Sequence, residues 1–207
     1  KMSPEEHLAH IKQTIDYALS KDFTVNLYLE DWSSGMRDSR DYLFTMMDEL
    51  VKLPIKRFLL PDTLGILNPL QCVEYMRQMV RRYPNSHFDF HAHNDYDLAV
   101  SNSLAAVLSG AKGLHVTVNG LGERCGNAPL ASVQVILKDM FEAKTNIKED
   151  RLNDISRLVE GYSGIAVAPN TPVVGDNVFT QVAGVHADGD NKDKLYCNDL
   201  VPERFGR

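Results

Sequence analysis

Residues 87–93 read HFDFHAH, and polar and apolar side chains alternate through the whole stretch. Successive side chains of a strand point to opposite faces, so Phe88, Phe90 and Ala92 share one face and the polar residues share the other. A parallel strand in an open sheet is covered on both faces and is usually apolar throughout. One apolar and one polar face therefore predict a closed barrel, with helices outside and polar side chains inside.

Two further stretches show the same division into two faces. In residues 23–30, apolar positions alternate with Asn26, Tyr28 and Glu30, and in residues 114–118 they alternate with His115 and Thr117. Polar side chains at the carboxyl ends of barrel strands are the usual place for an active site. These strands are therefore expected to carry the functional residues.

The predicted strands are separated by predicted helices, in steps of about thirty residues. The expected strands are 23–30, 55–61, 87–93 and 114–118, and the expected helices are 4–19, one through 43–51, one beginning at Asn68-Pro69, 98–108, 130–141 and 150–159. Such alternation predicts an α/β fold with parallel strands and right-handed crossovers. An open, doubly wound sheet is the alternative, but the glycine-rich phosphate motif that often follows its first strand is missing.

Composition narrows the class of protein. The chain has 207 residues, 43% of them hydrophobic, and a formal net charge of −6, which disfavours a nucleic-acid partner or an anionic membrane. No apolar stretch is long enough to span a membrane, and the first residues lack a signal-peptide pattern. Three widely spaced cysteines, Cys72, Cys125 and Cys197, are expected to be free thiols in a cytoplasmic protein.

His91 and His93 are the strongest local sign of chemistry. Side chains two residues apart on a strand share a face, so both imidazoles can reach one metal ion. Two histidines that only form hydrogen bonds in a polar interior fit the same spacing. The residues alone leave both readings open.

The loop 120–127, GLGERCGN, follows the last predicted strand. Its glycines let the backbone approach a ligand closely, and Asn127 can offer a carbonyl oxygen to a metal or cap the helix that begins near Pro129. Glu123 and Arg124 can simply form an ion pair. Asp62-Thr63 ends the second predicted strand. The Thr63 hydroxyl and N–H suit a substrate carboxylate and Asp62 can orient a neighbour, but ordinary capping is the favoured reading of these two residues.

The glycine-rich tail contains GVHADG at 184–189 and then Leu195-Tyr196. This places His186, Asp188 and Tyr196 in what is expected to be a flexible loop. A histidine is the usual general base near neutral pH, and a tyrosine can act as an acid or a hydrogen-bond donor. Surface residues without a role are the alternative.

Four motifs together resemble one family. They are LPDTLG at 60–65, HAHND at 91–95, NGLGERCGN at 119–127 and GVHADG at 184–189. The chain resembles the acetyl-CoA-dependent 2-isopropylmalate, citramalate and homocitrate synthases, which are relatives of the HMG-CoA lyase type of metal-dependent (β/α)₈ barrel. The resemblance runs in register over nearly the whole chain.

The resemblance implies a role for each candidate residue. The implied metal ligands, for zinc, manganese or magnesium, are His91, His93 and Asn127. The implied substrate-binding residues are Tyr28, Thr63 and Leu195, and the implied catalytic residues are Glu30, His186, Asp188 and Tyr196. Thr63 would hold the carboxylate of a 2-oxo acid, and His186 would enolise acetyl-CoA with help from Asp188 and Tyr196.

The expected activity is that of 2-isopropylmalate synthase, which uses 2-oxoisovalerate in leucine biosynthesis. Citramalate synthase, which uses pyruvate, is the alternative, followed by a lyase of the HMG-CoA type and by an inactive scaffold. The resemblance also implies a homodimer in which the His186 loop reaches the partner's barrel.

The chain departs from the family pattern at two places. The family's first strand carries an Arg-Asp pair that supplies an arginine and a metal carboxylate, and no match is found here, so the pair is expected ahead of Lys1. Residues 1–147 are therefore expected to form the C-terminal half of the barrel, and residues 148–207 a linker subdomain. Lys194 stands where some citramalate-type relatives have Asn, which weakens any transfer of their acetyl-CoA contacts.

Overall fold

The computed structural model describes residues 2–196 and 198–207. The chain divides into two compact units: Lys1–Val116 with Gly122–Ala128, and Thr117–Leu121 with Pro129–Arg207. The predicted boundary at residue 147 concerns the limit of a catalytic domain, and it stays a prediction.

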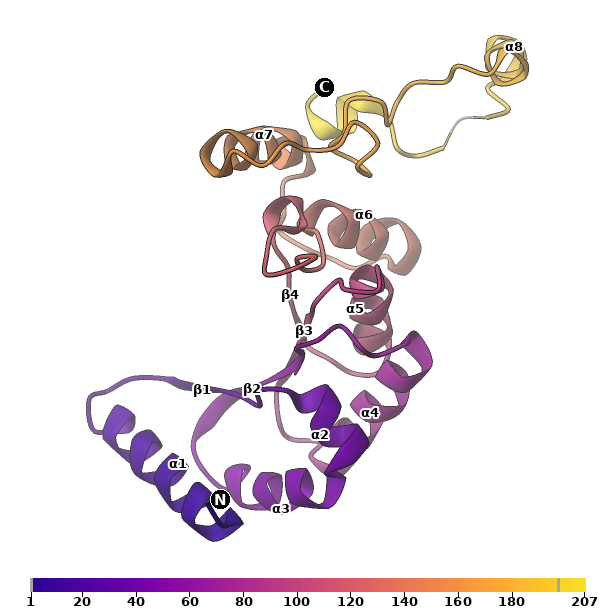
Figure 1. Cartoon of the computed structure of the whole chain (residues 1–207). Coiled ribbons are helices and arrows are strands. Elements are labelled where there is room, and N and C mark those ends of the chain that lie inside the picture. Colours follow the sequence, from indigo (N-terminus) through magenta and orange to yellow (C-terminus); the bar gives the residue numbers. More distant parts are fainter. Residues whose placement is uncertain (1, 197) are drawn as a thin grey trace. The chain divides into compact units, whose positions relative to one another are not determined.

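The first unit contains a parallel sheet of β1 (Val25–Tyr28), β2 (Ile55–Asp62), β3 (Phe88–Ala92) and β4 (Gly113–His115). The strands lie in the order β1-β2-β3-β4 (Figure 1). The prediction of a parallel α/β fold is confirmed. A doubly wound sheet changes direction at a switch point, whereas these described strands follow one another in sequence order, as in a barrel.

The helices of the first unit are α1 (Pro4–Leu19), α2 (Trp32–Asp38), α3 (Arg40–Leu50), α4 (Pro69–Arg82) and α5 (Ala99–Leu108). Helices α3, α4 and α5 follow one another along the same side of the sheet (Figure 1). The α4 helix starts where predicted, because Asn68 and Gln71 form a capping box around Pro69, which occupies the first helical position. The apolar faces of the strands pack on these helices, and Leu60, Phe90 and Met76 are completely buried.

The register of the sheet sets which inward residues meet. Tyr28, Leu59, Asp89 and Gly113 lie at one level across the strands. At the next level towards the carboxyl ends, Pro61 pairs with His91 and His91 pairs with His115. The polar positions that the sequence predicts to face inward therefore form adjacent layers.

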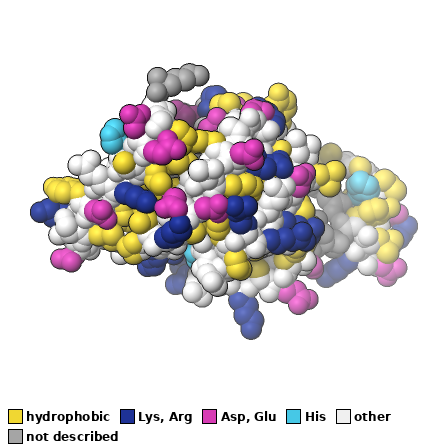
Figure 2. All heavy atoms as spheres, turned by 90° about the horizontal axis from the view of Figure 1, so that it is seen from below, with side chains coloured by type: hydrophobic (Ala, Val, Ile, Leu, Met, Phe, Trp, Pro, Cys, Tyr) yellow, Lys and Arg dark blue, Asp and Glu magenta, His cyan; other side chains and the backbone are white. Residues whose placement is uncertain are grey.

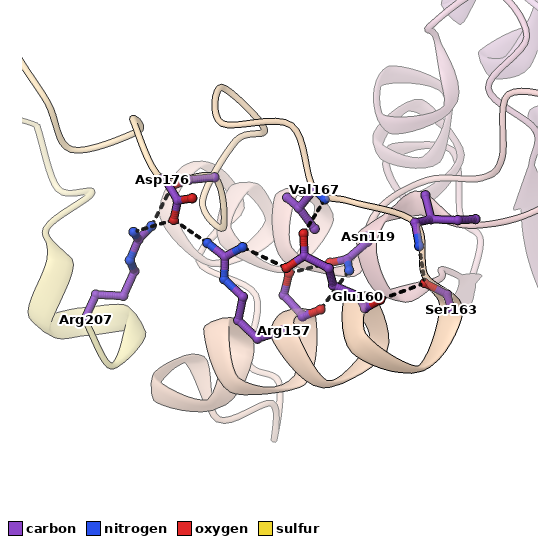
Figure 3. A network of polar contacts seen from close by, with 10 residues as sticks. Asn119, Arg157, Glu160, Ser163, Val167, Asp176 and Arg207 are labelled. Carbon is purple, nitrogen blue, oxygen red and sulfur yellow. Dashed lines mark hydrogen bonds and ion pairs between the residues drawn. The ribbon is translucent and has the colours of Figure 1, made fainter.

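The second unit is helical. It contains η1 (Val118–Gly120), α6 (Leu130–Phe141), η2 (Glu149–Arg151), α7 (Leu152–Ser163), α8 (Gly184–Asp193) and η3 (Pro202–Phe205). Its core packs Ala131, Val135, Leu152, Val173, Val174 and Phe205 together. Arg157 on α7 bonds Glu160 and Asp176, and Arg207 also reaches Asp176, which ties the loop after α7 to the C-terminal residues (Figure 3).

The prediction of a flexible loop around His186 is wrong. Residues Gly184–Asp193 form the helix α8, although the segment contains two glycines and its N-cap makes no side-chain hydrogen bond. Glycine lowers helix propensity by about 1 kcal/mol, which is why the sequence pattern did not predict a helix here.

Surface and thiol features agree with the composition. Figure 2 shows Lys and Arg side chains interspersed with Asp and Glu on the face that it draws. Within residues 2–196 and 198–207, no helix is both long enough and apolar enough to cross a membrane. Cys72 is buried, Cys125 is exposed, and both are free thiols as predicted, while Cys197 lies outside the described residues.

Candidate functional site

Aromatic and imidazole rings gather on the inward face of the first unit. The ring centroids of His91 and His93 lie 5.1 Å apart, and that of His115 lies 5.6 Å from His91. Tyr28 from β1 places its ring edge-on to His91, with the centroids 5.9 Å apart. The predicted pairing of His91 and His93 on one face is therefore present, and it lies at the carboxyl end of β3.

Asn127 lies beside both histidines, because its backbone forms a bridge with His93 and its side chain reaches His91. Its Nδ2 atom lies 3.2 Å from His91 Nε2 and donates to the Ala92 carbonyl at 3.1 Å. The alternative that Asn127 caps the next helix is wrong, because α6 has Pro129 as its N-cap and no side-chain cap bond. Close approach of the loop requires Gly122, since a Cβ there would lie 2.1 Å from Asn127 Oδ1.

A histidine must be neutral to bind a metal, and the surroundings of His91 favour its neutral form. Burial lowers the pKa of His91 to about 4, and the neighbouring His93 and His115 act in the same direction. The Nδ1 atoms of His91 and His93 are buried and have no hydrogen-bond partner. A buried polar atom without a partner is costly, so this pair of rings is suited to a ligand.

The donor set fits a divalent metal but is incomplete. Two imidazole nitrogens and an amide oxygen are ligands that zinc accepts. In this structure the Asn127 amide turns its Nδ2 atom to His91, so its oxygen could bind the same metal only with the amide reversed. In the described part of the chain, no group of three or more His, Cys, Asp or Glu side chains is placed to hold a metal. A metal at His91, His93 and Asn127 would therefore need ligands beyond the described His, Cys, Asp and Glu side chains.

Thr63 and Glu30 contact each other at the ends of two neighbouring strands. The Thr63 hydroxyl donates to Glu30 Oε1 at 2.8 Å and accepts the Asp31 amide at 3.1 Å. Asp62 points the other way: its buried carboxylate accepts the amides of Ile66 and Leu67, which is the capping chemistry expected at such a junction. Thr63 thus presents a hydroxyl beside a carboxylate, whereas Asp62 holds the loop.

Arg124 connects three of the loops at this end of the sheet. Its guanidinium bonds Asp95 Oδ1 at 2.7 Å and the Thr63 carbonyl at 2.7 Å, whereas Glu123 is 3.8 Å away. The main partner of Arg124 is therefore Asp95 and not its sequence neighbour. Sequence reasoning did not assign Asp95 a role, although it belongs to the HAHND motif.

Sequence reasoning also missed His115 and Asp89. The Tyr28 hydroxyl lies 3.1 Å from His115 Nδ1, and Asp89 Oδ2 lies 3.6 Å from His115 Nε2. Both residues stand on the polar faces that the alternation identifies, so the signal was present. The alternation did not indicate which of these polar residues contact one another.

In the second unit, two of the predicted catalytic residues come together. The rings of His186 and Tyr196 lie 4.5 Å apart. Asp188 instead bonds Lys192 at 2.6 Å, and the side chain of Leu195 is 67% exposed. The predicted roles of these four residues stay predictions.

Comparison with known proteins identifies the class of this chain. The HMGL-like family model matches residues 1–159, and the chain belongs to this family. It is 42% identical to a homocitrate synthase of Saccharolobus solfataricus and 37% identical to a putative (R)-citramalate synthase of Methanopyrus kandleri. Each alignment covers 100% of this chain, but only 44% and 40% of the relatives.

Solved structures show the same fold. An HMG-CoA lyase from Bacillus subtilis matches with a TM-score of 0.69 at 23% identity, over 79% of this chain and 57% of the lyase. An HMG-CoA lyase from Acinetobacter baumannii, in complex with coenzyme A and 3-methylmalate, matches with a TM-score of 0.58 at 25% identity, over 70% of this chain and 49% of that one. The four parallel strands thus match part of a (β/α)₈ barrel, which confirms the predicted fold class.

Proposed function

We propose that the complete protein containing this chain condenses acetyl-CoA with a short 2-oxo acid and hydrolyses the resulting thioester. The observation that carries the proposal is the gathering of His91, His93 and Asn127 at the end of β3, with two buried imidazole nitrogens that lack partners. The names of the relatives support it, because a citramalate synthase and a homocitrate synthase both align over the whole chain.

His91, His93 and Asn127 would hold a divalent ion. Such an ion supplies Lewis acidity to the carbonyl and carboxylate of a 2-oxo acid. Its two nitrogen ligands favour zinc, whereas manganese and magnesium prefer oxygen ligands. Thr63 would donate its hydroxyl hydrogen to the substrate carboxylate, which requires this hydrogen to leave Glu30 Oε1, its acceptor in this structure.

Pyruvate is the 2-oxo acid that we propose first. The sheet offers the substrate's remaining group a wall of Tyr28 and Leu59, which lie at the same level of the register. This wall suits a methyl group, and neither of its two side chains is a cation that would bind a second substrate carboxylate. The activity is then that of a citramalate synthase, and the 2-isopropylmalate synthase expected from the sequence has weaker support among the relatives reported above.

A homocitrate synthase is the second candidate. Its support is the higher identity, 42%, to a relative of that name. Such an enzyme needs a cationic group for the distal carboxylate of its substrate. Arg124 and Arg57, the arginines bonded near the predicted site, already pair with Asp95 and Asp89.

Thiol release from acetyl-CoA, measured on the complete protein with pyruvate, 2-oxoisovalerate and 2-oxoglutarate, tests the substrate. We expect the highest kcat/KM with pyruvate. A higher value for 2-oxoisovalerate or 2-oxoglutarate would assign the protein to the corresponding synthase. Absence of thiol release with all three would refute the condensation itself.

Metal analysis tests the site separately. We expect the His91→Ala/His93→Ala double variant to lose its bound divalent metal, and His10→Ala, a surface histidine on α1, to keep it. Equal metal content in the double variant and the unaltered protein would remove the assignment.

A further inference from the structure

We propose that His115 and Asp89 are positioning residues that hold Tyr28 against His91, and that this contact sets which 2-oxo acids fit. The inference rests on the proposed function for its substrate class. Neither the motifs nor the proposed reaction assigns a role to His115 or Asp89, whereas Tyr28 and His91 already have one.

The contact between Tyr28 and His115 crosses the sheet. Tyr28 lies on β1 and His115 ends β4, with two strands between them. The Tyr28 hydroxyl nevertheless lies 3.1 Å from His115 Nδ1, and the ring centroids are 5.9 Å apart. A tyrosine at an edge strand thus reaches over the intervening residues and is anchored at its far end.

The Asp89 carboxylate lies on the other side of the His115 ring, just beyond hydrogen-bond distance. Its side chain is 3% exposed, and three basic groups surround it: His87 Nε2 at 2.7 Å, Arg57 Nη1 at 3.3 Å and His115 Nε2 at 3.6 Å. A buried carboxylate favours a ring orientation that turns N–H groups towards it. The tautomer that carries its hydrogen on Nε2, facing Asp89, would leave Nδ1 to accept the Tyr28 O–H.

Strand β4 has a glycine opposite the Asp89 carboxylate, which leaves room for it. Residue 113 of β4 stands directly opposite Asp89, and a Cβ at Gly113 would lie 2.2 Å from Asp89 Oδ1. Any other residue would therefore displace the carboxylate from the His115 ring.

The arrangement commits the Tyr28 hydroxyl hydrogen to His115 and fixes the phenol ring edge-on to His91. The ring cannot withdraw without breaking the anchor. A 2-oxo acid bound at His91 and His93 would meet a wall of fixed position, so a longer or branched side chain would be rejected. Loss of the anchor frees the ring and relaxes this discrimination.

The test compares kcat/KM for pyruvate and for 2-oxoisovalerate in variants of the complete protein. We expect the ratio to fall about fivefold in His115→Ala, the factor that one neutral hydrogen bond is worth. Tyr28→Phe should give the same change, and the double variant no more than either. His115→Asn, whose amide oxygen can replace Nδ1 as the acceptor, should restore the ratio.

His87→Ala is the matched control. His87 is also a histidine bonded to Asp89, its side chain is also 31% exposed, and it makes no described contact with Tyr28. Its ratio should fall less than that of His115→Ala, because His87 can act on Tyr28 only through Asp89. An unchanged ratio in His115→Ala, or additive effects of His115→Ala and Tyr28→Phe, would overturn the proposal.

Crystal structures of the same variants give a readout that does not need activity. The Tyr28 ring should leave its edge-on position over His91 in His115→Ala and keep it in His87→Ala. If no 2-oxo acid supports thiol release, the proposed function fails while this structural comparison still decides the anchor. If Tyr28 keeps its place in His115→Ala, the anchor is refuted whatever the activity.

Discussion

His91 and Asn127 belong to a parallel sheet and the loop beside it, whereas His186 and Tyr196 belong to the short helix α8 and the segment after it. Backbone pairing with β2 and β4 fixes His91, and Asn127 is 5% exposed. His186 is exposed, and the large apolar side chains Val182 and Val185 near it are 91% and 66% exposed. Asn127 is therefore buried within the first unit, whereas His186 lies on an exposed surface of the second.

This difference bears on how a complete site would form. Large exposed apolar side chains around a functional residue usually mark a surface that another element covers. The first unit buries its own site residues wholly or in part, while the exposed apolar side chains of α8 and of the segment before it are open to a contact. The homodimer expected from the sequence, with His186 acting on the partner's barrel, is one such contact and stays a prediction.

The largest effect is expected from mixing two inactive variants of the complete protein. His91→Ala removes a metal ligand, and His186→Ala removes the expected base. If His186 acts across a two-fold dimer, each mixed dimer has one intact site and one with both lesions. Subunit exchange should then restore up to about half of the normal activity per mixed dimer.

The outcome of mixing has a clear opposite. If His186 serves its own barrel, every site in a mixed dimer keeps one lesion and no activity returns. Native mass spectrometry must confirm that exchange has occurred. Exchange without recovery would mean that His186 serves the barrel of its own chain. The exposure of α8 would then not indicate a contact with a partner subunit.

Local patterns in the sequence were sufficient for most of the fold. The helices Pro4–Leu19 and Leu130–Phe141 were predicted with their exact ends, because a capping box and regular apolar spacing mark them. The helix α2 was missed, since Trp32-Ser33-Ser34-Gly35 has low helix propensity and is preceded by Asp31 at positive φ. The last strand is shorter than predicted, because Asn119 turns at φ 58° and bonds Ser156.

The candidate site could be predicted only where the partners are close in sequence. His91 and His93 are two residues apart, so their common face follows from the strand period. The contacts of His115 with Tyr28 and of Arg124 with Thr63 join residues far apart in the chain, and no local pattern encodes them. Their geometry depends on strand register, which the sequence did not specify.

Gly122→Ala should break the first unit's site without unfolding it. The added Cβ would occupy the place of Asn127 Oδ1, so the amide must move away from His91. A misplacement of about 1 Å at a reacting centre costs about 100-fold in rate, and we expect that loss in kcat/KM. Isothermal titration should show weaker metal binding as well, and normal metal affinity in the variant would contradict the proposed role of Asn127.

Glu149→Gln should weaken the second unit in a pH-dependent way. Hydrogen bonds from Arg204, with further bonds from Lys138 and Gln134, lower the pKa of Glu149 from 4.5 to about 2. Its side chain is only 6% exposed. Because the folded pKa is depressed, the stabilisation is complete above about pH 4.5 and is lost as the pH falls towards 2.

Hydrogen exchange of the α6 and η3 amides in the complete protein measures this effect. We expect the opening free energy at pH 7 to fall by about 2 to 3 kcal/mol in Glu149→Gln, with a smaller difference from the unaltered protein at pH 3.5. Glu203→Gln, an exposed neighbour on η3, should change neither value. A difference that does not depend on pH would show that the charge of Glu149 is irrelevant.

The smallest expected effect has the opposite sign and compares a second glycine with Gly122. Gly161 lies within α7, and a Cβ there would meet no atom within 4 Å. Alanine removes backbone freedom from the unfolded chain without a clash, so Gly161→Ala should stabilise the α7 region by about 0.5 to 1 kcal/mol. Exchange of the α7 amides should slow accordingly, while kcat/KM stays unchanged. Loss of activity in this variant would mean that a ligand or a partner approaches α7 at Gly161. The second unit would then contain a contact surface that tolerates no added methyl group, as is the case at Gly122 in the first unit.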